Sequence, residues 1–212
     1  FDRDFPKPFL NLVLRKLNLA RSDSLYPGAR YHNRRDLLSF PKINKKGFVY
    51  EDAEPVPVRL IKKKAGLFAS IRKRDILLHI PYQPFRHLIT LLQEASIDPL
   101  VRRIQLTQYR LAKASCIAAA LQSAARNGKE VFVLVEPQAR FDEEANIKWA
   151  SRYRDAGVQV QLGVQGLKVH SKMVHITRKE SGRDRLYSVL GTGNFNEDTA
   201  GIFADHLLMT YN

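Results

Sequence analysis

A histidine and a lysine two residues apart, His170 and Lys172, are the side chains in this sequence best suited to chemistry on phosphate. They lie in the apolar run 167–176, which predicts a strand. Side chains alternate across a strand, so both should project from one face, with Cβ atoms about 6–7 Å apart. A neutral imidazole can attack phosphorus while the ammonium holds a non-bridging oxygen. Taken alone, however, an H-x-K tripeptide is more often an ordinary surface strand.

A second histidine, His175, lies on the same predicted strand. Its separation of five residues from His170 puts the two on opposite faces. Only His170 is therefore expected to meet a phosphate beside Lys172.

Two arginines follow predicted strands: Arg110 ends the run 104–110, and Arg140 comes just after the run 131–135. In open α/β sheets, ligands gather beyond the carboxyl ends of the strands. The arginine fork donates two parallel hydrogen bonds to phosphate oxygens. Either arginine alone is more commonly a surface ion pair, but the two together predict an anion site.

The segment GTGNFN, residues 191–196, follows another predicted strand. Its two glycines allow backbone N–H groups to face an anion, and Thr192, Asn194 and Asn196 add side-chain donors. Without further context such Gly-Asn pairs usually mark only a turn.

The elements around these residues predict an α/β fold with a mostly parallel, mixed sheet and helices on both faces. Apolar periodicity predicts helices over 84–98, 115–127 and 141–156, and strands over 104–110, 131–135, 158–162, 167–176, 186–190 and 205–210. Residues 1–56 hold too few apolar side chains for a core of their own. We interpret them as the end of a preceding domain plus a linker.

Composition limits the partners. The 212 residues carry 35 Lys and Arg against 21 Asp and Glu, a net charge of +14. Such an excess predicts a polyanionic partner, and nucleic acid, lipid head groups and inorganic polyphosphate all qualify. The single cysteine, Cys116, is expected to be a small core residue in a reducing compartment. No apolar run approaches the ~20 residues that span a bilayer, and the charged N-terminus predicts a piece of a longer cytoplasmic protein.

Five segments in order closely resemble the first C-terminal catalytic domain of polyphosphate kinase, in the phospholipase D superfamily. They are residues 80–99, 106–115, 125–150, 166–172 and 191–200. The resemblance begins near residue 25, and residues 28–41 are similar to the end of the domain that precedes the catalytic one. It implies that 1–56 belong to a preceding head domain and that 57–212 form a truncated phospholipase D-like catalytic domain.

The resemblance implies that His170 is the phosphorylated histidine and that Arg110 and Arg140 occupy positions associated with magnesium and phosphate. A guanidinium is a poor Mg²⁺ ligand, so we expect both arginines to hold phosphate oxygens or metal-bound water. Thr192 and Asn194 match the family's phosphate-holding element.

Two further positions matter in this comparison. Asp205 matches an aspartate that can orient His170, although partnership with a nearby basic residue is an equal alternative. Phe203 stands where the family commonly has a tyrosine packing on adenine, and its ring can still stack. The absence of an aspartate in the five residues after Lys172 favours a kinase over a lipase or nuclease.

The resemblance therefore implies reversible transfer of the terminal phosphate of ATP to polyphosphate through a phosphohistidine, with Mg²⁺ as cofactor. ATP, ADP and polyphosphate are the expected ligands, nucleic acid is not, and the full-length protein is expected to form a homo-oligomer. Attachment to the membrane periphery stays open. Two alternatives remain: a phospholipase D-like phosphodiesterase acting on nucleic acid or lipid through the same histidine, and a non-catalytic polyanion-binding module.

Overall fold

The computed structural model describes residues 1–20, 25–28, 47, 54–61, 65–112, 114–138 and 143–212. The chain divides into two compact units, Phe1–Asp52 and Ala53–Asn212. In the first unit, α1 spans Lys7–Lys16, and a bridge joins Asp2 to Gly28. The assignment of this unit to a preceding domain stays a prediction.

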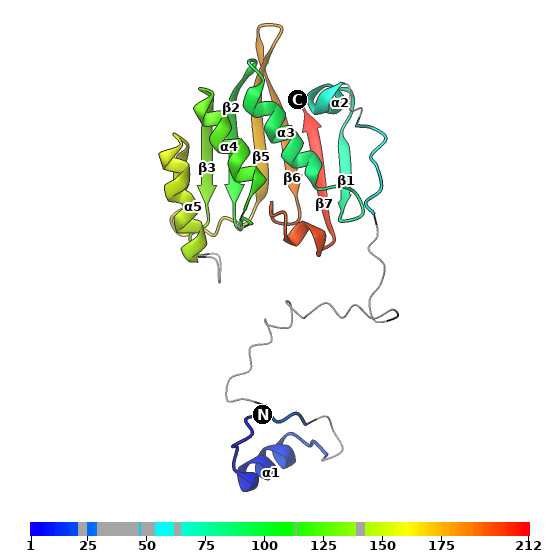
Figure 1. Cartoon of the computed structure of the whole chain (residues 1–212), viewed down its shortest axis with the longest axis vertical. Coiled ribbons are helices and arrows are strands. Elements are labelled where there is room, and N and C mark those ends of the chain that lie inside the picture. The colour runs from blue at the N-terminus through cyan, green and yellow to red at the C-terminus, as the bar shows by residue number, and fades with distance from the viewer. Residues whose placement is uncertain (21–24, 29–46, 48–53, 62–64, 113, 139–142) are drawn as a thin grey trace. The chain divides into compact units, whose positions relative to one another are not determined.

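The second unit is built on one seven-stranded sheet with the order β1-β7-β6-β5-β2-β3-β4 (Figure 1). The strands are β1 (Ile76–Ile80), β2 (Val101–Gln108), β3 (Glu130–Val135), β4 (Gln159–Leu162), β5 (Lys172–Glu180), β6 (Arg183–Gly191) and β7 (Asp205–Tyr211). The helices are α2 (Gly66–Lys73), α3 (Arg86–Ile97), α4 (Cys116–Arg126) and α5 (Glu143–Asp155), followed by the short 3-10 turn η2 (Thr199–Gly201).

The mixed α/β class is confirmed, but the expectation of a mostly parallel sheet is wrong. Only β2–β3 and β3–β4 are parallel pairs, whereas β1–β7, β7–β6, β6–β5 and β5–β2 are antiparallel. The missed feature is a tight hairpin between β5 and β6, where Ser181 and Gly182 both have positive φ, 48° and 79°. That pattern suits a two-residue hairpin turn, and the Ser-Gly pair was its signal in the sequence.

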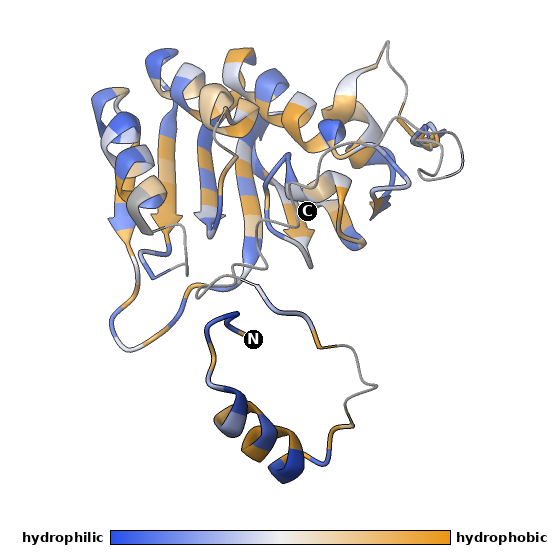
Figure 2. Ribbon diagram, turned by 60° about the horizontal axis from the view of Figure 1, so that its bottom comes forward, coloured by the Kyte–Doolittle hydropathy of each residue, from blue (hydrophilic) through white to orange (hydrophobic). Residues whose placement is uncertain are grey.

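The expectation of helices on both faces is also wrong for the described part of the chain. Figure 1 and Figure 2 show α2, α3, α4 and α5 gathered on one face of the sheet. For α4 and α5, the crossovers from β2 to β3 and from β3 to β4 explain this, because right-handed connections that step in one direction along a sheet place their helices on the same side.

The face under the helices forms the core. Along β5, Val174 and Ile176 are fully buried, whereas Met173 and His175 point to the other face and are partly exposed. The same alternation runs through β3, where Val131, Val133 and Val135 are buried. Helix α4 buries Ile117 and Leu121 against the sheet. Cys116 is exposed, so the prediction that it is a core residue is wrong.

Within the described residues no helix is both long and apolar enough to cross a membrane.

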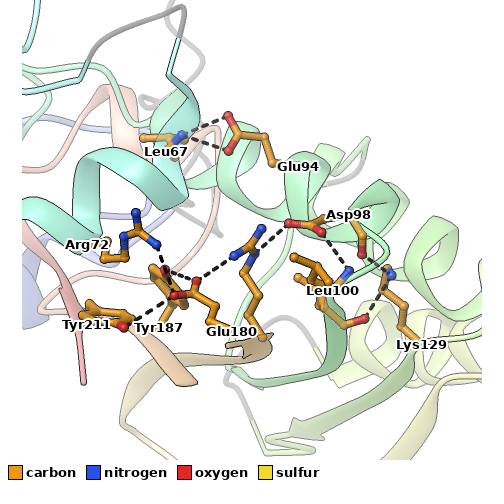
Figure 3. Close-up of polar contacts among 11 residues, drawn as sticks. Leu67, Arg72, Glu94, Asp98, Leu100, Lys129, Glu180, Tyr187 and Tyr211 are labelled. Carbon is orange, nitrogen blue, oxygen red and sulfur yellow. Dashed lines mark hydrogen bonds and ion pairs between the residues drawn. The ribbon is translucent and has the colours of Figure 1, made fainter. Parts of the chain in front are cut away.

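An ionic network at the hairpin end of β5 ties the helices to the sheet (Figure 3). Arg178 donates to Asp98 at 2.8 Å and to Glu180 at 2.7 Å, and the Tyr187 hydroxyl donates to Glu180 at 2.6 Å. Burial tends to raise the pKa of the Glu180 carboxyl, but the hydrogen bonds from Tyr187 and Arg178 oppose it and the pKa is lowered. The ionised form of Glu180 therefore stabilises the folded protein.

We expect Glu180→Gln to lower the free energy of unfolding near pH 7 by about 1.5–3 kcal/mol, the range for hydrogen bonds to charged groups. Because the pKa of Glu180 is lower in the folded protein, its carboxylate stabilises the fold at pH values above the unfolded-state pKa of about 4.3. This contribution is lost as the pH falls through the folded-state pKa. The variant should therefore lose less stability than the wild type on acidification, measured by urea unfolding at several pH values.

Glu130→Gln is the matched control. Its pair with Arg103 is solvated, with side chains 44% and 46% exposed, so the cost should stay below about 1 kcal/mol. Equal losses in the two variants would contradict a special role for the Glu180 network.

Candidate active site

The two predicted catalytic side chains meet where β2 ends and β5 begins. The predicted strand over 167–176 starts late: β5 begins at Lys172, and His170 precedes it in an irregular segment. Thr107 explains the interruption, because its hydroxyl donates to the carbonyl of Ser171 at 2.7 Å and accepts from the Met173 N–H at 2.9 Å. A side chain of β2 thus replaces regular backbone pairing at this point.

His170 and Lys172 remain neighbours despite this irregularity. The Lys172 ammonium donates to the backbone carbonyl of His170 at 2.6 Å, and the imidazole itself is exposed. His175 lies on the opposite face from Lys172, where its Nδ1 is 2.8 Å from the Ser188 hydroxyl. The alternation of β5 thus separates His175 from Lys172, whereas His170 precedes the strand, and the predicted face of its side chain stays a prediction.

The Lys172 side chain is unusually enclosed for a lysine, at 8% exposure. Burial lowers its pKa, and the negative charge of Asp205 partly opposes that effect. Asp205 opens β7, two strands away in the sheet, so the fold brings the predicted aspartate into the electrostatic environment of the predicted lysine.

Thr192 and Gly193 hold Asp205 in place. The Thr192 hydroxyl donates to Asp205 Oδ1 at 2.8 Å and accepts from the His206 N–H at 2.9 Å. A Cβ atom on Gly193 would overlap the Asp205 carboxylate. The geometry therefore shows Thr192 orienting an acid, whereas the sequence suggested a direct phosphate donor.

The rest of the 191–198 loop is tied to the start of α4. Glu197 accepts from the Ser115 hydroxyl at 3.0 Å and from the Ile117 N–H at 3.1 Å. Asn196 is buried and accepts from the N–H groups of Asp198 and Thr199, so it shapes the loop. Asn194 Oδ1 is buried with no hydrogen-bond partner among the described residues.

Two buried residues that the sequence did not single out organise the neighbouring segments. Glu136, at 3% exposure, accepts from the Val169 N–H at 2.7 Å, one residue before His170. Asn146 donates to the carbonyls of Tyr109 and Glu136, both at 2.9 Å, and so joins the segments after β2 and β3. Glu136 directly follows β3, a position that could have pointed to it, whereas Asn146 lies within α5 and carried no such signal.

Three further residues were predicted to belong to the site: Arg110, Phe203 and Arg140. Arg110 lies two residues beyond β2, with its guanidinium carbon 5.8 Å from the Tyr109 ring centroid. Phe203 is 59% exposed in the loop between η2 and β7. Arg140 lies outside the described residues. Within the described part of the chain, no group of three or more His, Cys, Asp or Glu side chains could hold a metal ion.

The arrangement is an exposed imidazole beside a partly desolvated ammonium, with an arginine near the ring of Tyr109 and one oriented carboxylate acting on the ammonium. Attack on phosphorus by imidazole, with cations neutralising the transferring group, is the chemistry this set suits. The fold and site thus define a mixed α/β domain that carries a histidine and a group of cations at one end of its central strands.

Comparisons with known proteins agree. Residues 66–212 match the family model for polyphosphate kinase C-terminal domain 1. The polyphosphate kinase of Vibrio cholerae is 44% identical over 212 residues, which cover 100% of this chain and 30% of that protein. That of Escherichia coli is 46% identical over 215 residues, 99% of this chain and 31% of that protein. The crystal structure of Porphyromonas gingivalis polyphosphate kinase superimposes with a TM-score of 0.75 at 35% identity, covering 100% of this chain and 32% of that one.

The chain belongs to the polyphosphate kinase family, and residues 66–212 form its C-terminal domain 1. It spans about a third of the length of these relatives. The resemblance that the sequence motifs suggested is thereby confirmed. The link to phospholipase D and the homo-oligomeric state stay predictions.

Gly193→Ala should displace Asp205, because the added methyl group would occupy the carboxylate's position. We expect a loss of about 1–3 kcal/mol in stability and a fall in the activity of the full-length enzyme. Gly201→Ala is the matched control, since a Cβ there meets nothing within 4 Å. Thermal unfolding and enzyme assays of both variants check this, and two alanine variants that behave alike would contradict it.

Proposed function

We propose that this chain carries the phosphorylated histidine of a polyphosphate kinase, and that His170 carries the terminal phosphate of ATP to the end of a polyphosphate chain and back. The observation that best supports this is the exposed imidazole of His170 beside the enclosed ammonium of Lys172, whose Nζ is 2.6 Å from the His170 carbonyl. Membership of the polyphosphate kinase family supplies the substrate class.

The proposed reaction has two balanced steps. An imidazole nitrogen attacks the terminal phosphorus of ATP, the bond to the bridging oxygen breaks, and ADP leaves. A terminal oxygen of polyphosphate then attacks the phosphohistidine, and the nitrogen–phosphorus bond breaks. Both steps move a phosphoryl group between the imidazole and a polyanion, so positioning and charge neutralisation supply most of the catalysis.

Lys172 and Arg110 are the described cations placed for that task. An ammonium has three donors, and the contact with the His170 carbonyl uses one. The other two can meet a non-bridging phosphate oxygen. Arg110 adds the planar fork that suits phosphate, and we expect Arg140 to act with it. Burial lowers the pKa of Lys172, and the negative charge of Asp205 opposes that shift in part, which favours the charged ammonium.

Magnesium enters this proposal through the substrate. Guanidinium groups cannot ligate a cation, and Asp205 is the acidic side chain that the fold brings to Lys172. Mg²⁺ would therefore be held chiefly by phosphate oxygens, neutralising their charge, while Arg110 and Arg140 hold those oxygens or metal-bound water.

The histidines provide the test. In the full-length protein incubated with ATP labelled on its terminal phosphate, His170→Ala should abolish the phosphoenzyme and polyphosphate synthesis. His175→Ala is the matched control and should retain both, because that ring contacts Ser188 on the other face of the sheet. Mass spectrometry under non-acidic conditions locates the phosphate. Label on His175, or an active His170→Ala enzyme, would contradict the proposal, and hydrolysis of a phosphodiester would favour the phospholipase D-like alternative.

Arg110→Lys tests whether geometry matters as well as charge. A lysine keeps the positive charge but loses the two parallel donors. We expect the apparent affinity of the full-length enzyme for polyphosphate to fall by about tenfold, the equivalent of roughly 1.4 kcal/mol. Steady-state kinetics at varied polyphosphate concentration measures it, and an unchanged KM would show that charge alone suffices.

A further inference from the structure

Tyr109 lies at the centre of the cations and the histidine. It follows the last residue of β2, and its backbone carbonyl is held by Asn146, which is only 1% exposed. The backbone that carries the ring is therefore restrained by β2 and by this hydrogen bond. Its centroid is 5.3 Å from that of His170, with the two planes at 82°, a T-shaped contact.

Three cationic groups surround the same ring. Lys172 Nζ is 5.3 Å from the ring centroid, and Lys168 Nζ and the Arg110 guanidinium carbon are each 5.8 Å from it. These distances fall within the range in which an aromatic face attracts a cation. A carboxylate in this position would also gather cations, but it would cancel their charge. An aromatic ring attracts them without cancelling their charge.

His170 needs such support more than a residue on a regular strand would. It is exposed and lies in the irregular segment before β5. Its backbone is restrained by the Lys172 ammonium and by the neighbouring Val169–Glu136 hydrogen bond, but neither restrains the plane of the imidazole. Reactivity is sensitive to that orientation, since a displacement of about 1 Å can cost roughly a hundredfold in rate.

We propose that Tyr109 is a positioning residue for phosphoryl transfer: its ring sets the plane of the His170 imidazole and holds the Lys172 ammonium beside it. The inference rests on the proposed role of His170. The ring does this work, and the phenol hydroxyl is not required. A phenylalanine should therefore replace Tyr109, whereas an aliphatic side chain of similar bulk should not.

The test compares Tyr109→Leu with Tyr109→Phe in the full-length protein. The single-turnover rate of His170 phosphorylation should fall by about tenfold or more in the leucine variant and stay within about twofold of wild type in the phenylalanine variant. The dissociation constant for ATP and the thermal midpoint should change little in both. A role confined to packing would instead lower the midpoint and leave the rate of the folded enzyme unchanged.

A second measurement is independent of catalysis. In protein carrying isotope-labelled histidine, the NMR signals of the His170 ring should keep their ring-current shift in the phenylalanine variant and lose it in the leucine variant. Failure of wild-type His170 to become phosphorylated would overturn the proposed function, and the ring signals would then decide the role of Tyr109. A leucine variant phosphorylated at the wild-type rate, or one with unchanged ring signals, would overturn the inference.

Discussion

The antiparallel pairing of β5 with β2 is the constraint on which the site depends. β2 also pairs with β3 in parallel, so the carboxyl ends of β2 and β3 and the amino end of β5 meet at one edge of the sheet. Arg110 lies there because it follows the end of β2, and His170 lies there because it precedes the start of β5. A purely parallel sheet would have placed the start of β5 at the opposite edge, about a strand length away.

Irregular backbone at this edge has to be satisfied by side chains, since buried N–H and C=O groups without partners are costly. Four side chains supply these partners, and each forms a hydrogen bond with a backbone group in a segment next to the site: Thr107, Glu136, Asn146 and Glu197. Glu136 and Asn146 are almost fully buried. Their hydrogen bonds convert loops that could adopt many conformations into a defined frame for the reactive groups.

Much of this frame could be predicted from sequence, and the failures have identifiable causes. Apolar periodicity located α3, α4 and β3, because one face of each is buried against the same core. It could not reveal which strands run antiparallel, since direction depends on long-range pairing, although the Ser181–Gly182 turn carried a local signal. The motif residues His170 and Lys172 were recognisable by type, but their support by Tyr109 and Glu136 required three-dimensional contacts.

The two ends of β5 show how one basic chain uses its charge in two ways. At the hairpin end, Arg178 is paired with the carboxylates of Asp98 and Glu180, which satisfies its donors and fixes the helices on the sheet. At the other end, Lys172 shares the face of Tyr109 with further cations, with Asp205 as an opposing charge. Cations that are neutralised in the ground state contribute to folding and have little left for a ligand. Cations gathered on an aromatic ring keep a positive potential that a phosphate chain can neutralise. The two ends of β5 therefore differ in electrostatics: paired charges stabilise the fold at the hairpin end, and cations near an aromatic ring give the other end a potential suited to an anion.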